Sequence, residues 1–472
     1  MTAGPDGPAL RLTATWVARA MDAALVAGDP WQEFHGVSID TRTLAPGDLF
    51  IAIRGERLDG VEFADAAIEK GAAGVVVPRG SKSSATAREV VIEVDDTTLA
   101  LQALGHAIRR QSGTKVVAIT GSAGKTTTKE VAAEFLAARY RVVRNRGNLN
   151  NHIGLPLSLV ELRQRPEIAV VELGMNHPGE ISTLVRVAEP DVRVWTNVGE
   201  AHLGFFASVD AIADAKAEIF EGASPSTLLV ANADEDRIVA RRRTFAGRVV
   251  TFGIDRVADV HASAIVDRGI DGTTARVTTP RGSVELTTPL VGRGNLENIL
   301  AATAVAEEFD VPLATVAELA ATLRPAAHRG EVVRLASGIT IIDDSYNANP
   351  TATKRALEVL ARAASGRRRI AVLGEMLELG DRAFELHAGV GRAAAAARVD
   401  VLLTVGGDAA AALADAALAA GMPRDAVRYY PTSAEAADAA SALAAPGDVV
   451  LVKGSRGVRT DVVVDRLKAE RG

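Results

Sequence analysis

A glycine-rich run that follows an apolar strand is the segment of this chain best suited to chemistry. It consists of Gly121, Ser122, Ala123, Gly124, Lys125, Thr126 and Thr127. Glycines let backbone N–H groups turn toward phosphate oxygens, and the helix beyond directs its positive end at them. Lys125 is expected to bridge the β- and γ-phosphates of a nucleotide, and the Thr126 hydroxyl to bind Mg²⁺. Only two residues separate the glycines, instead of the usual four, so an ordinary glycine turn is the alternative.

Three further side chains are candidates for the same site. Glu172 ends an apolar strand, and the carboxyl edge of a parallel sheet faces the ligand crevice, where a hard oxygen ligand suits Mg²⁺. His202 follows the next strand and is expected at the same edge. The alternatives are that Glu172 pairs with a surface cation and that His202 is structural. Lys216 stands in an ordinary helical segment, and its spacing alone favours a solvated lysine.

Composition excludes several classes of protein. The 472 residues are 48% hydrophobic and carry a net charge of -6, which argues against a general nucleic-acid binder. The absence of cysteine from the sequence excludes disulfides and thiolate metal sites and is compatible with the cytoplasm, where we expect the protein. No signal peptide and no apolar run long enough to span a membrane are visible, so a soluble protein is predicted.

Strand-like and helical segments alternate and predict an α/β protein of three domains, at residues 1–112, 113–323 and 324–472. The central domain is expected to hold a mostly parallel sheet of the phosphate-loop type, with strands at 115–120, 168–173, 192–198, 227–232 and 249–253. Residues 259–291 carry β segments with tight turns and predict a small antiparallel addition. The N-terminal domain is expected to be a smaller α/β unit, and the C-terminal domain Rossmann-like, with strands at 339–343, 369–373, 399–405 and 449–452.

The glycine-rich run, Glu172-Leu173-Gly174, and the segment from Asn197 to His202 followed by Lys216 resemble the ATPase domain of the Mur ligase family. The resemblance extends over essentially the whole chain. In the first region Asp40-Thr41-Arg42 and Pro46-Gly47-Asp48-Leu49-Phe50 resemble a UDP-sugar-binding domain. In the third region the runs at 343–350 and 453–457 resemble the member that adds D-alanyl-D-alanine to UDP-N-acetylmuramoyl-tripeptide. The resemblance implies an ATP-dependent, ADP-forming amide ligase of peptidoglycan precursor synthesis that works through an acyl phosphate.

The resemblance also implies roles for individual residues. It makes Lys216 a carbamylated lysine that holds a second Mg²⁺ together with His202 and Glu172, which gives two ions in the site. It puts Asn295 and Asn298 near the adenine, and Arg329 and Asp344 against the phosphates and ribose. The residues implied for the UDP-peptide and dipeptide substrates are Thr41, Arg42, Asn150, Asn151, Asn347, Asn349 and Arg456.

Two positions depart from the family pattern, and several alternatives stay open. Val61 and Gly294 stand where the family often has histidine, which bears on the uridine domain and on the adenine pocket. The nearest alternatives are the tripeptide-forming Mur enzyme and a folylpolyglutamate synthase. A nucleotide-driven switch and a non-catalytic nucleotide-binding module are alternatives of other classes. We expect a monomer with no nucleic-acid partner and no membrane span.

Overall fold

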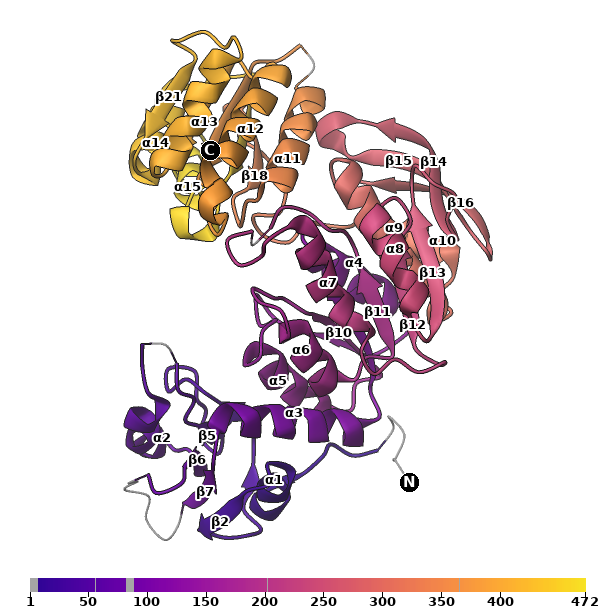
Figure 1. Ribbon diagram of the computed structural model, residues 1–472, viewed down its shortest axis with the longest axis vertical. Coiled ribbons are helices and arrows are strands. Elements are labelled where there is room, and N and C mark those ends of the chain that lie inside the picture. The colour runs from indigo at the N-terminus through magenta and orange to yellow at the C-terminus, as the bar shows by residue number, and fades with distance from the viewer. Residues whose placement is uncertain (1–6, 56, 82–88, 202, 365) are drawn as a thin grey trace.

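The computed structural model describes residues 7–55, 57–81, 89–201, 203–364 and 366–472. Three units follow one another along an arc, with the N-terminal unit at one end, the C-terminal unit at the other and the central unit between them (Figure 1). Each unit is built on its own sheet, as the sequence predicts for an α/β protein. In the described part of the chain no helix has the length and apolar character that crossing a membrane requires.

The N-terminal unit contains a five-stranded sheet in the order β2-β7-β6-β5-β4 and a two-stranded sheet of β1 and β3. Strand β2 is antiparallel to β7, and the other neighbours in the larger sheet are parallel. The elements are β1 (Leu12–Thr13), α1 (Ala14–Ala20), β2 (Ala24–Ala27), β3 (Glu33–Phe34), β4 (Val37–Ser38), β5 (Leu49–Ile51), η1 (Gly60–Phe63), α2 (Ala64–Glu69), β6 (Gly74–Pro78), β7 (Val90–Val94) and α3 (Thr97–Ser112).

Helix α3 joins the N-terminal unit to the central unit. It begins after Asp96, whose carboxylate accepts hydrogen bonds from the backbone N–H groups of Thr98 and Leu99 and so caps the helix. Its buried face, which includes Leu101, Leu104 and Ile108, packs against α5 and α6 of the central unit. Figure 1 shows α3 lying along the base of these two helices.

The central unit is a nine-stranded sheet in the order β16-β15-β14-β13-β12-β11-β8-β10-β9. The pairs from β9 to β14 are parallel, and β14, β15 and β16 are antiparallel, which confirms the predicted addition. Its elements are β8 (Lys115–Thr120), α4 (Lys125–Ala137), β9 (Val142–Arg144), α5 (Gly154–Leu159), η2 (Val160–Gln164), β10 (Ile168–Glu172), α6 (Glu180–Ala188), β11 (Val192–Trp195), α7 (Val209–Ala217), η3 (Glu218–Phe220), β12 (Leu228–Asn232), α8 (Asp236–Arg241), η4 (Arg242–Thr244), β13 (Arg248–Gly253), β14 (Val260–Asp267), η5 (Gly269–Asp271), β15 (Thr273–Thr279), β16 (Gly282–Thr288), α9 (Arg293–Glu308) and α10 (Leu313–Ala320).

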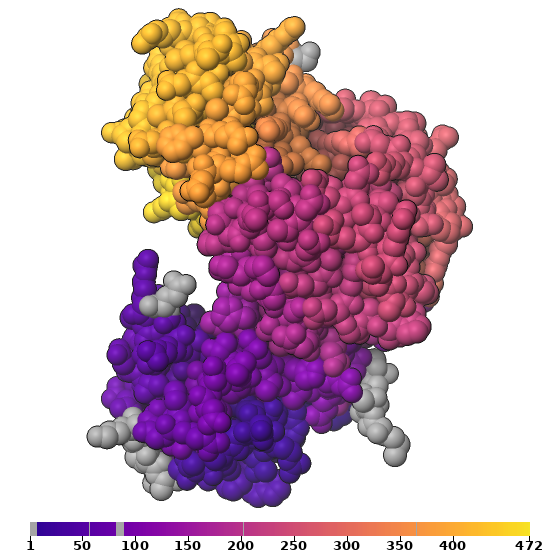
Figure 2. Space-filling view, in the orientation of Figure 1, coloured from indigo at the N-terminus to yellow at the C-terminus, as the bar shows by residue number. Residues whose placement is uncertain are grey.

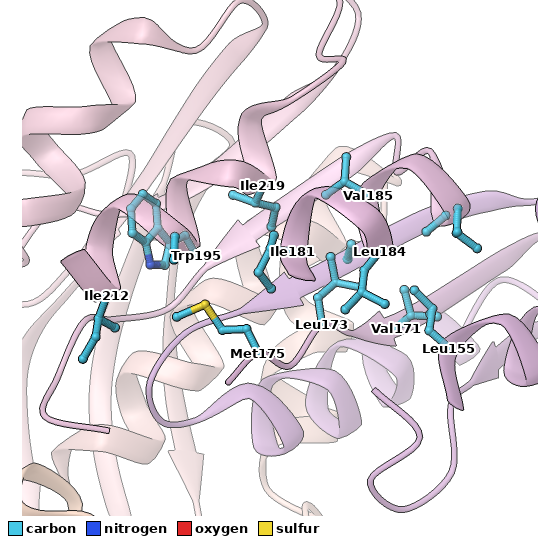
Figure 3. Close-up of a cluster of buried hydrophobic side chains, with 14 of the residues drawn as sticks. Leu155, Val171, Leu173, Met175, Ile181, Leu184, Val185, Trp195, Ile212 and Ile219 are labelled. Atoms are coloured by element: carbon cyan, nitrogen blue, oxygen red, sulfur yellow. The ribbon is translucent and has the colours of Figure 1, made fainter. Parts of the chain in front are cut away.

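Both faces of the parallel sheet are buried, which explains why its strands read as continuous apolar runs. Successive residues of a strand point to opposite faces, so Val170 packs toward α4 and α9 while Val171 packs in the layer on the other side. That second layer is drawn in Figure 3, where Leu173 and Trp195 lie close to apolar side chains of the covering helices such as Ile181. The two layers hold the carboxyl ends of β8, β10 and β11 in fixed positions.

The C-terminal unit is a six-stranded sheet in the order β17-β18-β22-β19-β20-β21, in which only β17 is antiparallel to its neighbour. The crossover between β18 and β19, with β22 between them, is a doubly wound topology and agrees with the Rossmann-like prediction. The elements are β17 (Glu331–Arg334), β18 (Thr340–Asp344), α11 (Pro350–Ala363), β19 (Arg369–Gly374), η6 (Gly380–Arg382), α12 (Ala383–Ala396), β20 (Val401–Val405), α13 (Asp408–Ala419), β21 (Val427–Tyr430), α14 (Ser433–Leu443), β22 (Val449–Lys453), η7 (Arg456–Val458) and α15 (Asp461–Arg471).

The packing of α3 on the central unit can be tested with two identical substitutions in one helix. Leu104 is fully buried, whereas the side chain of Leu99 is 62% exposed. We expect Leu104→Ala to lower the free energy of unfolding by about 2–5 kcal/mol and Leu99→Ala to change it by less than about 0.5 kcal/mol. Urea denaturation followed by circular dichroism measures both. Equal losses for the two variants would contradict the packing described here.

Candidate active site

The glycine-rich run forms the turn between β8 and α4, as predicted. Helix α4 begins at Lys125, and its N-cap residue Gly124 adopts a left-handed backbone with φ +79° and offers no side chain to cap the helix. The first N–H groups of the helix are therefore free of a side-chain cap, and the helix dipole gives them a positive potential. This is a suitable geometry for the phosphates of a nucleotide.

The segment that follows β11 holds this turn in place. The backbone N–H of Ala123 donates to Oδ1 of Asn197 at 2.8 Å, and the N–H of Gly199 donates to the Ser122 hydroxyl at 2.9 Å. Asn197 also donates from Nδ2 to the Ala123 carbonyl at 3.0 Å. Asn197 belongs to the motif that the sequence singled out, but its contact with the turn was not predicted.

Lys125 lies at the base of the turn. Its Nζ donates to the Gly121 carbonyl at 2.8 Å. Burial lowers the pKa of Lys125, the carboxylate of Glu172 opposes this shift, and the guanidinium of Arg329 adds to it. An ammonium group held in a desolvated site interacts strongly with an incoming anion, because the local dielectric constant is low.

The Glu172 carboxylate lies at the end of β10 and joins two loops. Its Oε2 accepts a hydrogen bond from the Thr126 hydroxyl at 2.8 Å, and its Oε1 accepts one from Nδ2 of Asn150, also at 2.8 Å. Arg329 approaches the same hydroxyl, with 3.2 Å between Nη2 and Oγ1 of Thr126. The structure therefore brings together two predicted metal ligands, Thr126 and Glu172, with Arg329, predicted for the phosphates and ribose, and Asn150, predicted for the substrate.

These oxygen atoms fit a magnesium ion. A hydroxyl and a carboxylate held side by side are hard oxygen donors, and Mg²⁺ takes few protein ligands because phosphate and water oxygens complete its shell. Among the residues that the structure describes, no group of three or more His, Cys, Asp and Glu side chains could hold a metal on its own. The described donors thus suit a metal that binds together with a nucleotide.

Lys216 is buried in α7 rather than solvated, so the interpretation favoured by its spacing alone was wrong. Its side chain is 2% exposed. Burial lowers the pKa of Lys216 well below the usual range for lysine, the like charge of Lys125 lowers it further, and Glu172 opposes the shift. His202, predicted to share this site, lies outside the described residues.

The two asparagines predicted near the adenine lie on α9. Asn298 accepts a hydrogen bond from the Thr128 hydroxyl at 3.2 Å and donates from Nδ2 to Asn295 Oδ1 at 3.4 Å. Both line a cavity of about 540 Å³ between the central and C-terminal units. Gly294 lines it too, and a Cβ there would lie 3.6 Å from a guanidinium nitrogen of Arg355. The glycine that replaces the histidine of the family pattern therefore lies beside Arg355 in the cavity wall.

The C-terminal unit contributes the opposite wall of this cavity, with Asp344, Asn347, Asn349 and Arg456 among its lining residues. The carboxylate of Asp344 pairs with the buried Lys453 at 2.6 Å, and the same ammonium donates to the Asn347 carbonyl at 3.0 Å.

Tyr346, which the sequence analysis did not assign, holds two cations. The guanidinium of Arg329 lies 4.0 Å from the centre of its ring and that of Arg456 5.8 Å from it. Only its position inside the run at 343–350 could have drawn attention to it.

Two of the predicted substrate residues have a local structural role. Asn349 caps α11 by accepting the N–H of Ala352 at 2.8 Å, and Asn151 accepts the N–H of Gly154 at 2.8 Å at the start of α5. Asn349 also lines the cavity, so it has both a structural contact and a surface toward the site.

Thr41 and Arg42 belong to the N-terminal unit and do not line this cavity. The guanidinium of Arg42 pairs with Asp40 at 2.6 Å, and this contact lowers the pKa of Asp40 to about 2. Figure 2 shows that the N-terminal and C-terminal units lie apart on one side of the molecule, with a notch between them that is backed by the central unit. A ligand bound to both would have to extend across this notch.

The fold and site define a nucleotide-dependent enzyme. Its phosphate loop and its acidic strand end come from neighbouring strands of the central sheet, and the C-terminal unit contributes the opposite wall of the cavity. Sequence profiles agree on its class. That of the Mur ligase middle domain matches residues 119–306, that of the Mur ligase glutamate ligase domain matches 328–456, and that of the Mur ligase family catalytic domain matches 33–109.

Relatives and solved structures extend the likeness over the whole chain. The UDP-N-acetylmuramoyl-tripeptide--D-alanyl-D-alanine ligase of Bacillus subtilis (strain 168) is 36% identical over 92% of this chain and 93% of its own length. That of Escherichia coli (strain K12) is 37% identical over 78% and 81%. A crystal structure of MurF from Acinetobacter baumannii has a TM-score of 0.88 at 31% identity, covering 98% of this chain and 100% of that one. MurF from Thermotoga maritima in complex with ADP has a TM-score of 0.80 at 28% identity, covering 92% and 97%.

The chain belongs to the Mur ligase family. It is accordingly an ATP-dependent, ADP-forming ligase, as the sequence predicted. A folylpolyglutamate synthase from Mycobacterium tuberculosis, one of the alternatives considered above, shares the fold with a TM-score of 0.62 but is only 17% identical.

The left-handed glycine of the phosphate loop can be tested against a matched glycine. Gly124 and Gly179 are both N-cap residues with positive φ, at +79° and +87°, but only at Gly124 would a Cβ collide, 2.3 Å from Oδ1 of Asn298. We expect Gly124→Ala to weaken ADP binding by more than about tenfold and Gly179→Ala to leave it nearly unchanged, since backbone strain alone is common to both. Isothermal titration calorimetry measures the two affinities. A similar loss in both variants would contradict the role of the collision.

The contact between Tyr346 and Arg329 predicts a second pair of variants. Tyr346→Leu removes the ring. We expect kcat/KM for ATP, measured by ADP release, to fall by about 2- to 30-fold, because a cation–π contact contributes roughly 0.5–2 kcal/mol. Tyr346→Phe keeps the ring and should retain most of the activity. If both variants lost activity equally, the hydroxyl rather than the ring would be responsible.

Proposed function

We propose that this ligase joins D-alanyl-D-alanine to UDP-N-acetylmuramoyl-tripeptide, with conversion of ATP to ADP and phosphate, in peptidoglycan precursor synthesis. The observation that carries the proposal is the position of Glu172, whose carboxylate accepts hydrogen bonds both from Thr126 of the phosphate loop and from Asn150, a predicted substrate residue. On this proposal the Glu172 carboxylate lies between the phosphates of the nucleotide and the second substrate. The names of the relatives from Bacillus subtilis and Escherichia coli support the choice of substrates.

The chemistry follows from the poor reactivity of a carboxylate, which has no adequate leaving group. A carboxylate oxygen of the tripeptide attacks the γ-phosphorus of ATP, the bond from that phosphorus to the bridging oxygen of ADP breaks, and an acyl phosphate forms. The dipeptide amine then attacks the acyl carbon, the C–O bond to phosphate breaks, and the nitrogen loses a proton. Lys125 and Arg329 place positive charge beside the transferred phosphoryl group, which is the main requirement of such a transfer.

We infer that Thr126 and Glu172 hold one Mg²⁺, which when bound neutralises charge between the phosphates and the carboxylate. For a second ion we propose that Lys216 is carbamylated and acts with His202 and Glu172. The charges of the described residues support this assignment, because the buried Lys216 and the half-buried Lys125 both interact with Glu172 and repel each other. A carbamate on Lys216 would replace repulsion between two cations by attraction.

We assign the nucleotide base to Asn295 and Asn298, and the ribose and phosphates to Asp344 and Arg329. Support comes from the cavity that these four residues share between the central and C-terminal units. Enclosure by two units excludes water, which would otherwise hydrolyse the acyl phosphate. Thr41 and Arg42 of the N-terminal unit are proposed to hold the UDP end of the substrate, and Asn347 and Arg456 of the C-terminal unit the peptide end.

Coupled measurement of ADP release tests the proposed reaction. We expect rapid release only when ATP, the UDP-muramoyl tripeptide and D-alanyl-D-alanine are all present, with one amide formed for each ADP. The control reactions omit either the UDP-muramoyl tripeptide or D-alanyl-D-alanine. Equal ADP release without the peptides would instead identify a nucleotide-driven switch, and turnover with a different acid or amine would identify another ligase of the family.

The proposed carbamate predicts chemical rescue. We expect Lys216→Ala to lower kcat by more than about a hundredfold and added short-chain carboxylates, such as formate or acetate, to restore part of it by supplying the missing anion. Lys115→Ala is the control, since the Lys115 side chain is 61% exposed. Full activity of Lys216→Ala without added acid would exclude the carbamate.

A further inference from the structure

Another buried lysine, in addition to Lys216 and Lys453, lies close to the site. Lys129, on α4, is 1% exposed, and its Nζ donates to the backbone carbonyl of Asn145 at 2.7 Å. Its ammonium also lies 3.1 Å from Oε1 of Glu130. None of the roles described above uses Lys129.

The residue that Lys129 holds is itself joined to both loops of the site. Asn145 directly follows β9 and is 2% exposed. Its Oδ1 accepts the backbone N–H of Glu172 at 3.0 Å, and its Nδ2 donates to the carbonyl of Leu149 at 2.7 Å. Asn145 thus fixes the end of β10 on one side and the loop that carries Asn150 on the other.

Helix α4 is therefore connected to Glu172 by two routes, one to its carboxylate and one to its backbone. Thr126 and Lys129 are three residues apart, so they lie near each other on one face of the helix. Thr126 donates directly to the carboxylate, and Lys129 acts through Asn145 on the backbone of Glu172 and on the loop of Asn150. The helix whose N-terminus faces the phosphates is in this way connected to the predicted substrate loop.

We propose that Lys129 is a positioning residue that sets the loop at 145–150, and with it Asn150, relative to the phosphate loop. This proposal rests on the function proposed above, because that function supplies the substrate that the loop would hold. A buried charge is costly, and an apolar side chain would fill this place without a desolvation penalty. What the ammonium adds is a strong directional bond to one carbonyl, which fixes the start of the loop.

Lys129→Met tests the proposal with Glu130→Gln as the matched control. The methionine keeps the aliphatic stem and removes the donor. Glu130→Gln removes the ion pairs of Glu130 with Lys129 and Arg144 and leaves the bond from Lys129 to Asn145. We expect Lys129→Met to lower kcat/KM for the UDP-muramoyl tripeptide by about tenfold or more, with the KM for ATP changed by less than about twofold. Glu130→Gln should resemble the wild type in both constants.

Hydrogen exchange without ligands supplies a readout that does not depend on activity. We expect the backbone amides at 145–151 to exchange about tenfold faster in Lys129→Met than in the wild type, while those of β8 are unchanged. If Lys129→Met does not fold, Lys129→Gln serves in its place, since its shorter side chain keeps a donor that falls short of the carbonyl.

The outcomes separate this proposal from the proposed function. Unchanged exchange at 145–151 together with an unchanged kcat/KM for the tripeptide would overturn the positioning role. A similar rise in the KM for ATP and in the KM for the tripeptide, together with a lower melting temperature, would also overturn it. That pattern indicates a lysine that only stabilises the fold. Failure of the wild-type protein to form the amide would overturn the proposed function, and the exchange measurement would still decide the role of Lys129.

Discussion

The carboxylate of Glu172 accepts one hydrogen bond from each of two loops, and the arrangement of the site depends on this contact. Thr126 comes from the first turn of α4, which follows β8, and Asn150 comes from the loop after β9. The carboxylate at the end of β10 thus joins the connections of three neighbouring strands. Parallel strands bring their carboxyl ends to a single edge, and only there can such loops meet. The nine-stranded sheet, buried on both faces, keeps this edge rigid enough for phosphates and a carboxylate to approach each other.

Local patterns in the sequence were sufficient for much of the fold and part of the site. The turn at Gly124 and the strand that ends at Glu172 were predicted because glycine conformation and apolar runs are properties of short segments. The antiparallel addition was likewise visible in its turns, and the structure has it as β14, β15 and β16. The short strand β9, which carries the chain to Asn145, was not predicted, since three residues give too little periodicity.

Side chains that act over long distances in the sequence were harder to find. The spacing of Lys216 favoured a solvated helix, and only the resemblance to a family suggested otherwise. Its burial results from the position of α7 among α6, α8 and η3, which no local pattern encodes. Tyr346 was missed because its partner Arg329 belongs to a separate segment. Lys129 was missed for a simpler reason, since a lysine in a helix is normally solvated.

Polar contacts that join the central and C-terminal units have a consequence for the separation of these units. Arg362 pairs with Asp267 at 3.3 Å, and Arg334 pairs with Asp271 at 2.7 Å, in both cases with a largely exposed arginine. Exposed ion pairs of this kind contribute only about 0–1 kcal/mol each and are screened by salt. Separation of the two units is therefore inexpensive in free energy at these two contacts. The ion pair between Arg355 and the buried carboxylate of Glu297, at 3.2 Å, is the more shielded electrostatic link between the units, and added salt weakens it less.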